Sequence, residues 1–176
     1  MKVNVRDILL EGLRLKIAED GSELQAIAGE MGFLIIPPVS ADLLFLKSDG
    51  DIFVRGDMNA LLKLRCSRCL KEFEHRISSN IDIVYTLGSL HGVKEKEKEL
   101  TREEVNTQHL AGDEIDINAV LVEQLSLDTP MQSVCRSNCK GLCPKCGRDL
   151  NEGECGCHAA GHIDSRFAKL RELKPK

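Results

Sequence analysis

Apolar and polar residues alternate over two long stretches in the middle of the chain. Most even positions of Ile52–Cys66 are apolar, and most apolar residues of Phe73–Leu87 fall on odd positions. Such alternation is typical of half-buried strands. Asp49-Gly50 is a two-residue hairpin signal between Leu43–Ser48 and the first stretch. We therefore predict an antiparallel sheet in which Cys66–Cys69 forms the tip of a long hairpin.

Shorter patterns predict the elements that precede this hairpin. Leu13–Ile17 alternates and indicates a short strand. Ser22 with Gln25 has the form of a capping box, which predicts a helix that begins here and ends at Gly32. The face that this helix would bury carries Leu24, Ile27, Ala28 and Met31. Gly56 is expected to host a β-bulge in the first long strand.

A second helix is predicted in the later part of the chain. Asp116 has the character of an N-cap, and Pro130 ends the helical pattern. The buried side of this helix would carry Ile117, Val120, Leu121 and Leu125. We expect this helix to cover one face of the sheet, because an apolar sheet face needs a partner.

These elements predict an α+β fold: an antiparallel β-sheet with covering helices and a C-terminal cysteine-rich, zinc-ribbon-like segment. Residues 1–130 would form the α+β domain, with a charged, flexible connection at about 88–112. Residues 131–160 would form the cysteine-rich segment, and 161–176 a basic tail. The cysteine-rich segment is poor in apolar residues, so metal would have to organise it.

Length and composition exclude several function classes. The chain of 176 residues is too short for a barrel enzyme of about 250 residues. No apolar run approaches the roughly 18 residues of a membrane span, and the N-terminus has no apolar core of secretory type. We therefore expect a cytoplasmic protein without membrane contact. A formal charge of −4 and an aromatic content of 3% argue against indiscriminate phosphate binding and against base stacking.

The eight cysteines carry the strongest chemical signal. In a reducing compartment, close-set cysteine pairs indicate metal rather than disulfides. Eight thiols complete two four-sulfur zinc sites, so we predict about two Zn²⁺ per chain. The preferred partition places Cys66, Cys69, Cys135 and Cys139 in one site and Cys143, Cys146, Cys155 and Cys157 in the other. Alternatively, the two C-x2-C pairs share an ion, or His158 or His162 replaces one of the last cysteines.

Three catalytic functions of cysteine sites fit these cysteines less well than structural metal binding. The spacing of Cys139, Cys143 and Cys146 matches a radical iron–sulfur motif, but the chain lacks the large barrel that this chemistry needs. A redox C-x2-C normally opens a helix, whereas Cys66–Cys69 lies between strands. Hydrolytic zinc needs an open coordination position, and four-sulfur sites are closed. We therefore expect no enzymatic activity and no small-molecule substrate.

Basic residues gather beside the cysteines. Residues 135–176 carry nine Lys and Arg against five Asp and Glu, a net charge of +4, which leaves −8 for residues 1–134. The basic side chains either balance the thiolate charge or contact RNA phosphates. The candidate RNA contacts are Arg65, Arg68, Lys71, Lys140, Lys145 and Arg148.

The order of motifs resembles a bacterial family. These motifs are Arg55-Gly56, Arg65–Leu70, Asp116–Asn118, Leu125–Leu127, Pro130-Met131, Cys135–Gly147 and Asn151–Gly153. From about residue 49 to 173 the chain resembles the YceD-like family, the large ribosomal RNA subunit accumulation proteins. The resemblance implies a role in 23S ribosomal RNA accumulation and large-subunit biogenesis.

Two other functions stay open beside contact with ribosomal RNA or a pre-ribosomal particle. The acidic first 134 residues favour an adaptor that binds basic ribosomal proteins and no RNA. A redox-switched zinc chaperone is a third class, which would lose zinc under oxidant. Salt dependence distinguishes the first two, because only phosphate contacts weaken steeply with salt.

Overall fold

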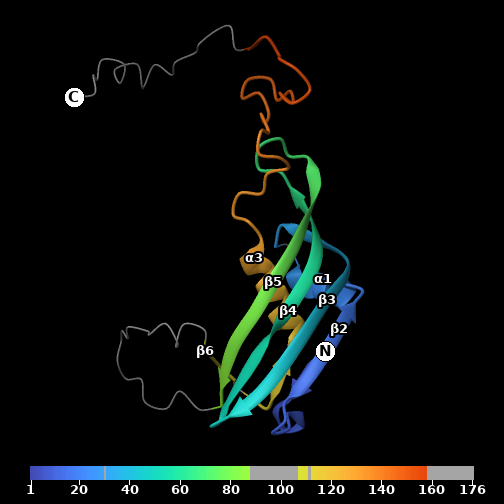
Figure 1. The fold of residues 1–176 in the computed structure, drawn as a ribbon. Helices are drawn as coiled ribbons and strands as arrows, with labels where there is room; N and C mark the ends of the chain where they lie inside the picture. The colour runs from blue at the N-terminus through green and yellow to red at the C-terminus, as the bar shows by residue number, and fades with distance from the viewer. Residues whose placement is uncertain (30, 88–106, 111, 158–176) are drawn as a thin grey trace, which may run out of the picture.

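The computed structural model describes residues 1–29, 31–87, 107–110 and 112–157. A five-stranded sheet of order β2-β3-β4-β5-β6 forms the body of the α+β fold (Figure 1). Its strands are β2 (Leu13–Glu19), β3 (Phe33–Ser48), β4 (Asp51–Arg65), β5 (Glu72–Thr86) and β6 (Thr107–His109). A second, two-stranded sheet pairs β1 (Lys2–Asn4) with β7 (Glu114–Asp116), and the 3-10 turn Val5–Asp7 follows β1.

The two predicted hairpins are confirmed. Asp49 and Gly50 join β3 to β4, both with positive φ (52° and 91°), as a tight primed turn requires. The β4–β5 ladder runs without a register shift from Asp51↔Thr86 to Arg65↔Glu72. The even residues of β4 that we expected inside are buried: Ile52, Val54, Met58, Ala60, Leu62 and Leu64. This long hairpin ends at Cys66–Cys69, away from the helices (Figure 1).

The predicted bulge at Gly56 is wrong. Gly56 pairs in register with Leu43 and Ile81, and a β-carbon on it would collide with the backbone of β3 at Asp42. The glycine therefore permits close strand approach. The irregularity lies instead in β3 between Ile36 and Ser40, at the two prolines, which have no N–H to give to the ladder.

Helix α1 (Ser22–Ala28) differs from its prediction at both ends. Gly21 is the N-cap, in a left-handed conformation, and Gly29 ends the helix three residues before Gly32. Leu24 and Ala28 are buried as expected, but Ile27 is 45% and Met31 50% exposed. The helix is too short to bury four residues on one face.

Gln25 has a contact with the sheet in place of a capping role. Its Oε1 accepts from the Ile35 N–H at 2.7 Å, and its Nε2 donates to the Phe33 carbonyl at 3.5 Å. Strand β2 pairs with β3 only from Val39 to Phe45, so these two residues have a strand neighbour on one side alone. The Gln25 amide thus covers an open stretch of strand edge.

Helix α3 (Ile117–Asp128) confirms the second predicted helix. The Asp116 carboxylate accepts from the N–H groups of Asn118 and Ala119, and Thr129 is the C-cap. The four expected apolar residues are buried, together with Asn118 and Val122. Helices α1 and α3 pack against each other and cover one face of the sheet, where the main core lies.

Other expectations meet the structure only in part. Thr107–His109, within the stretch expected as a connection, pairs with β5 as the parallel strand β6. Residues 88–106, the two histidines His158 and His162, and the basic tail lie outside the described residues. Among the described helices, none has both the length and the apolar character to cross a membrane.

Candidate metal centres

The eight cysteine sulfurs form two groups of four. The first contains Cys66, Cys69, Cys135 and Cys139, and the second Cys143, Cys146, Cys155 and Cys157. Within each group all sulfurs lie within 4.8 Å of one another. We call these groups the first and second clusters. The grouping corresponds to the partition preferred from the sequence rather than to a shared C-x2-C site.

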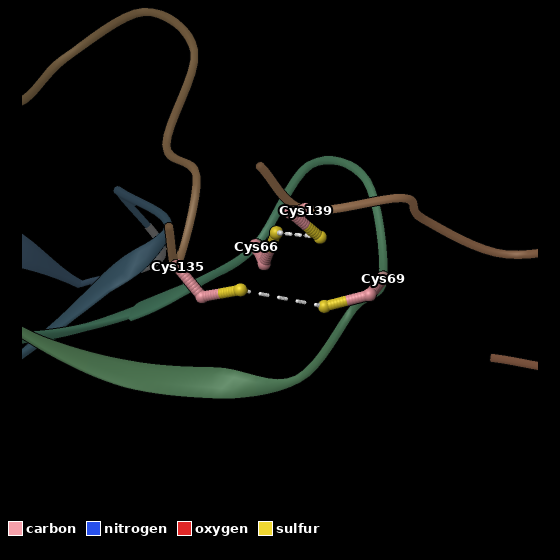
Figure 2. Close-up of side chains that lie close together, drawn as sticks. All are labelled: Cys66, Cys69, Cys135 and Cys139. Atoms are coloured by element: carbon pink, nitrogen blue, oxygen red, sulfur yellow. Dashed lines mark hydrogen bonds between the residues drawn. The ribbon is translucent and has the colours of Figure 1, made fainter. Parts of the chain in front are cut away.

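The first cluster joins two distant parts of the chain. Cys66 and Cys69 come from the tip of the β4–β5 hairpin, and Cys135 and Cys139 from the segment after α3 (Figure 2). The backbone carbonyl of Ser133 accepts from Ser67 N at 2.7 Å, so the later segment is hydrogen-bonded to the tip. The second cluster is local, because its cysteines span residues 143–157.

Both C-x2-C turns have the same backbone hydrogen bonds. In the first, Leu70 N donates to the Cys66 carbonyl at 2.9 Å. In the second, Gly147 N donates to the Cys143 carbonyl at 2.9 Å. The residue after the last cysteine is left-handed in both, with φ of 60° at Leu70 and 74° at Gly147. These are the tight turns that bring two sulfurs to one point.

The sulfur spacing suits a tetrahedral ion. In the first cluster the Cys66–Cys139 sulfurs are 3.9 Å apart and the Cys69–Cys135 sulfurs 3.7 Å (Figure 2). A tetrahedral Zn²⁺ with bonds of about 2.3 Å places its sulfurs about 3.8 Å apart. A disulfide needs about 2.05 Å, and all eight thiols are unpaired. The donor set therefore fits zinc.

The two clusters differ in their surroundings. Cys66, Cys69 and Cys139 are 0–4% exposed and pack with Phe73, Val134 and Leu142. In the second cluster only Cys143 is buried, and Cys146 is exposed. The first cluster thus lies in an apolar shell, and the second lies near solvent.

Two thiols of the first cluster, Cys66 and Cys139, and one of the second, Cys143, have a pKa below the ordinary value. Burial opposes ionisation of Cys66, but backbone N–H donors at Cys135, Cys69 and Arg68 lower its pKa to about 6. N–H groups of the second turn, at Cys146 and Lys145, lower the pKa of Cys143 to about 6. Because metal binds the thiolate, a lowered pKa reduces the proton release that metal binding requires of these sulfurs.

The segment between the clusters packs against the hairpin tip. Leu142 N donates to the Arg68 carbonyl at 3.1 Å, and Arg68 Nη1 donates to the Cys139 carbonyl at 3.0 Å. Gly141 has φ of 74°, and a β-carbon on it would lie 2.9 Å from the Arg68 carbonyl oxygen. The approach therefore requires glycine at this position.

The six basic residues predicted to contact RNA fall into two groups. Arg65, Lys140 and Arg148 are exposed, and no side-chain partner is found for them among the described residues. Lys71 binds the carboxylates of Asp149 at 2.8 Å and Glu152 at 2.6 Å. Arg68 donates to a carbonyl as described, and Lys145 Nζ donates to the Cys157 carbonyl at 3.1 Å. Lys71 is therefore an internal ion-pair partner, which the sequence alone did not reveal.

Sequence reasoning also missed Asp149 and Asn151. The Asp149 side chain is 9% exposed, and the bond from Lys71 lowers its pKa to about 2. Asn151 Nδ2 donates to Cys139 Sγ at 3.4 Å. The sequence pattern included Asn151, but no spacing rule relates it to a cysteine of the other cluster.

Comparison with known proteins adds a family. Residues 54–174 match the family model described as large ribosomal RNA subunit accumulation protein YceD. This stretch contains all eight cysteines and most of the long hairpin.

Several curated proteins are similar to the chain. An uncharacterized protein of Mycobacterium tuberculosis strain H37Rv is 30% identical over 150 residues, which cover 85% of this chain and 67% of the relative. A chloroplastic protein of Arabidopsis thaliana, named large ribosomal RNA subunit accumulation protein YCED homolog 1, is 25% identical over 140 residues, or 68% of this chain and 44% of the relative. A Zea mays protein of the same name is also 25% identical. No solved structure matches the chain.

Proposed function

We propose, on the premise that this chain belongs to the YceD family of large ribosomal RNA subunit accumulation proteins, that it supports accumulation of 23S ribosomal RNA as a non-enzymatic zinc-binding factor. The single observation that carries the proposal beyond the family name is the pair of complete four-sulfur clusters, the first of which includes the tip of the hairpin. In our proposal each cluster holds one Zn²⁺, and the metal fixes turns that present cations to ribosomal RNA.

The proposed RNA contacts are cations beside the cysteines whose side chains have no partner within residues 1–29, 31–87, 107–110 and 112–157. Arg65, Arg136, Lys140 and Arg148 are exposed, and each lies within two residues of a cysteine. Their guanidinium and ammonium groups suit phosphate oxygens, which position a protein on RNA without reading its sequence. Lys71 is left out because two carboxylates already neutralise it.

The metal part is tested by elemental analysis. Protein purified without added metal should contain about two zinc ions per chain. One ion or none would contradict the two-site proposal, and bound iron would contradict the choice of zinc.

The RNA part is tested by salt dependence. Four phosphate contacts give a log–log salt slope of about −3, at roughly 0.7 to 0.9 per phosphate. Changing Arg65, Arg136, Lys140 and Arg148 to Ala should flatten this slope and lower 23S RNA in cells, without release of zinc. A control variant removes the same charge from exposed positions of the first two strands, the first 3-10 turn and β3: Lys2, Arg6, Lys16 and Lys47.

The adaptor function is the alternative outcome. If the first variant keeps wild-type RNA levels and still binds pre-ribosomal particles, the cations only balance thiolates. The particle would then be bound through a protein surface. Co-purification that survives ribonuclease would support this adaptor function.

A further inference from the structure

The Asn151 side chain links the loop of the second cluster to a ligand of the first. Its Nδ2 donates to Cys139 Sγ at 3.4 Å, and its Oδ1 accepts from Lys140 N at 2.9 Å. Asn151 itself lies between Cys146 and Cys155, the two halves of the second cluster. From a loop of the second cluster, one amide therefore contacts Cys139 of the first cluster and the residue that follows it, Lys140.

The orientation of this amide is determined by its neighbours. Asp149 Oδ1 accepts from Asn151 Nδ2 at 2.6 Å and from Asn151 N at 2.8 Å. A half-turn of the amide would place its oxygen against the carboxylate and the sulfur, and its N–H groups against the N–H of Lys140. Only the observed orientation satisfies all the donors and acceptors.

Asp149 is in turn held by the hairpin tip. Lys71 Nζ lies 2.8 Å from Asp149 Oδ2 and 2.6 Å from Glu152 Oε1. Lys71 follows Cys69 by two residues, so the series of one ion pair and two hydrogen bonds begins beside one cysteine of the first cluster and ends on another. The series runs from Lys71 through Asp149 and Asn151 to Cys139.

We propose that Asn151 is a positioning residue for the metal of the first cluster. The inference rests on the metal occupancy proposed above. Four thiolates and one divalent ion carry a net charge of −2, and an N–H···S bond stabilises that charge at Cys139. Because the second cluster fixes the loop that carries Asn151, an ion in the second cluster raises the affinity of the first.

The test uses the full chain with Co²⁺ as the probe. Asn151→Asp is close in shape but replaces the N–H donor by an oxygen that faces Cys139 and Asp149. It should lower the Co²⁺ affinity of one of the two sites by about tenfold or more, the usual effect of losing an outer-shell partner. The thiolate-to-cobalt absorption band of that site should also shift. Asn151→Ala, which adds no charge, should act in the same direction.

Three further variants sharpen the result. Lys71→Ala should weaken the same site by a smaller factor, and Lys71→Arg should restore it, because the cation is kept. Asn138→Asp is the matched control: Asn138 is exposed, lies beside the same Cys139, and has no side-chain hydrogen bond among the described residues.

The outcomes are distinct. Wild-type affinity and an unshifted band in Asn151→Ala would overturn the positioning role, while two bound ions would leave the metal proposal intact. Equal losses of Co²⁺ affinity in Asn138→Asp and Asn151→Asp would show that the added negative charge alone causes the effect. This result would also overturn the positioning role. A wild-type chain that binds fewer than two ions would overturn the metal proposal and this inference together.

Discussion

The two cysteine clusters share one turn geometry but receive different support from the rest of the protein. The first takes its cysteines from a hairpin tip and from a segment more than 60 residues away, and an apolar shell surrounds it. The second is confined to residues 143–157, and the β-bridge that joins Asp149 in this range to the preceding Leu142 is an isolated one. The sheet therefore supports the first cluster, whereas the second would depend on the proposed ion.

The largest expected effect separates the clusters by mutation. Cys66→Ser removes a ligand that is fully buried at the hairpin tip, so the first ion should be lost and residues 131–142 should detach. Structural zinc sites contribute roughly 10 kcal/mol or more of apparent binding free energy in small peptides. Amide exchange should show faster exchange in this segment while the β4–β5 ladder stays protected.

Cys155→Ser is the matched variant in the second cluster. It should release one ion and leave the segment around Cys135 protected, since those contacts belong to the hairpin tip, even though the inferred coupling lowers the metal affinity of the first cluster. If Cys66→Ser leaves residues 131–142 protected while the Cys143 turn loses its ion, the two C-x2-C turns share one ion. This result would contradict the division of the cysteines into the first and second clusters.

Chelation should distinguish the clusters by rate. A thiolate that is exposed, such as Cys146, is open to attack by a competing ligand, whereas the sulfurs of Cys66 and Cys69 are shielded. We expect biphasic zinc release to a chelator, with the second cluster in the fast phase. In Cys155→Ser only the slow phase should remain, and a surviving fast phase would contradict the assignment.

The residue after each C-x2-C turn gives a smaller effect. Gly147 and Leu70 have the same left-handed conformation, which costs a side chain about 1–2 kcal/mol. Gly147→Ala should therefore weaken metal binding at the second cluster by about 1 kcal/mol. Leu70→Gly should relieve strain at the first cluster but stabilise it by only roughly 0.5 kcal/mol, because the larger entropy that glycine loses on folding offsets part of the gain.

Competition with a colorimetric chelator measures both variants. The control must change a residue without the backbone cost expected at Gly147. Gly153→Ala does not meet this condition, because Gly153 also has a positive φ. Ser67→Ala, an exposed change within the first turn, should alter neither affinity. Equal affinities for Gly147→Ala and wild type would show that the second turn can change its conformation.

Acidification gives the smallest expected effect on stability. An ion pair in the sheet serves as the reference for metal release from the clusters. The Asp42 carboxylate accepts two hydrogen bonds from Arg14, at 2.7 and 2.9 Å, and these bonds lower its pKa below the ordinary 3.8. A depressed pKa means that the stabilisation is fully present above 3.8 and is lost as the pH falls through the lower, folded value. Metal release should come earlier, because thiolates take up protons at higher pH.

Urea unfolding of wild type and Asp42→Asn measures this reference. The difference in unfolding free energy should be constant from pH 7 to 5 and should vanish at the acid end. Zinc release followed in the same samples should be complete before that difference disappears. A difference that grows on acidification would have the wrong sign and would contradict the ion-pair account.

Patterns within one segment were predictable from the sequence. Alternation of apolar and polar residues predicted β4 and β5. Asp49-Gly50 predicted the turn between β3 and β4, and Asp116 predicted the start of α3. Cysteine spacing favoured the grouping of sulfurs that the structure shows, because the second set is local and the first is what remains. These features depend on the local conformational preferences of the residues and on their spacing within one segment.

Features that depend on distant partners were not predictable. Ile27 and Met31 looked like core positions, but α1 ends at Ala28 and leaves them exposed. Lys71 was predicted to contact RNA. Its two carboxylate partners are about 80 residues away in the chain, so the ion pairs could not be recognised from the sequence. Three-residue strands such as β6 have no periodicity to detect, since pairing alone defines them.

The side chain of Gln25 has a consequence for how the protein behaves at high concentration. Unpaired backbone groups on a strand edge are a template for a second molecule, and sheet proteins protect such edges. Here a single amide occupies the Ile35 N–H and the Phe33 carbonyl. Gln25→Ala would leave these groups to solvent and, beside exposed Leu34, to another copy of the chain. One helix residue thus helps to keep neighbouring molecules apart.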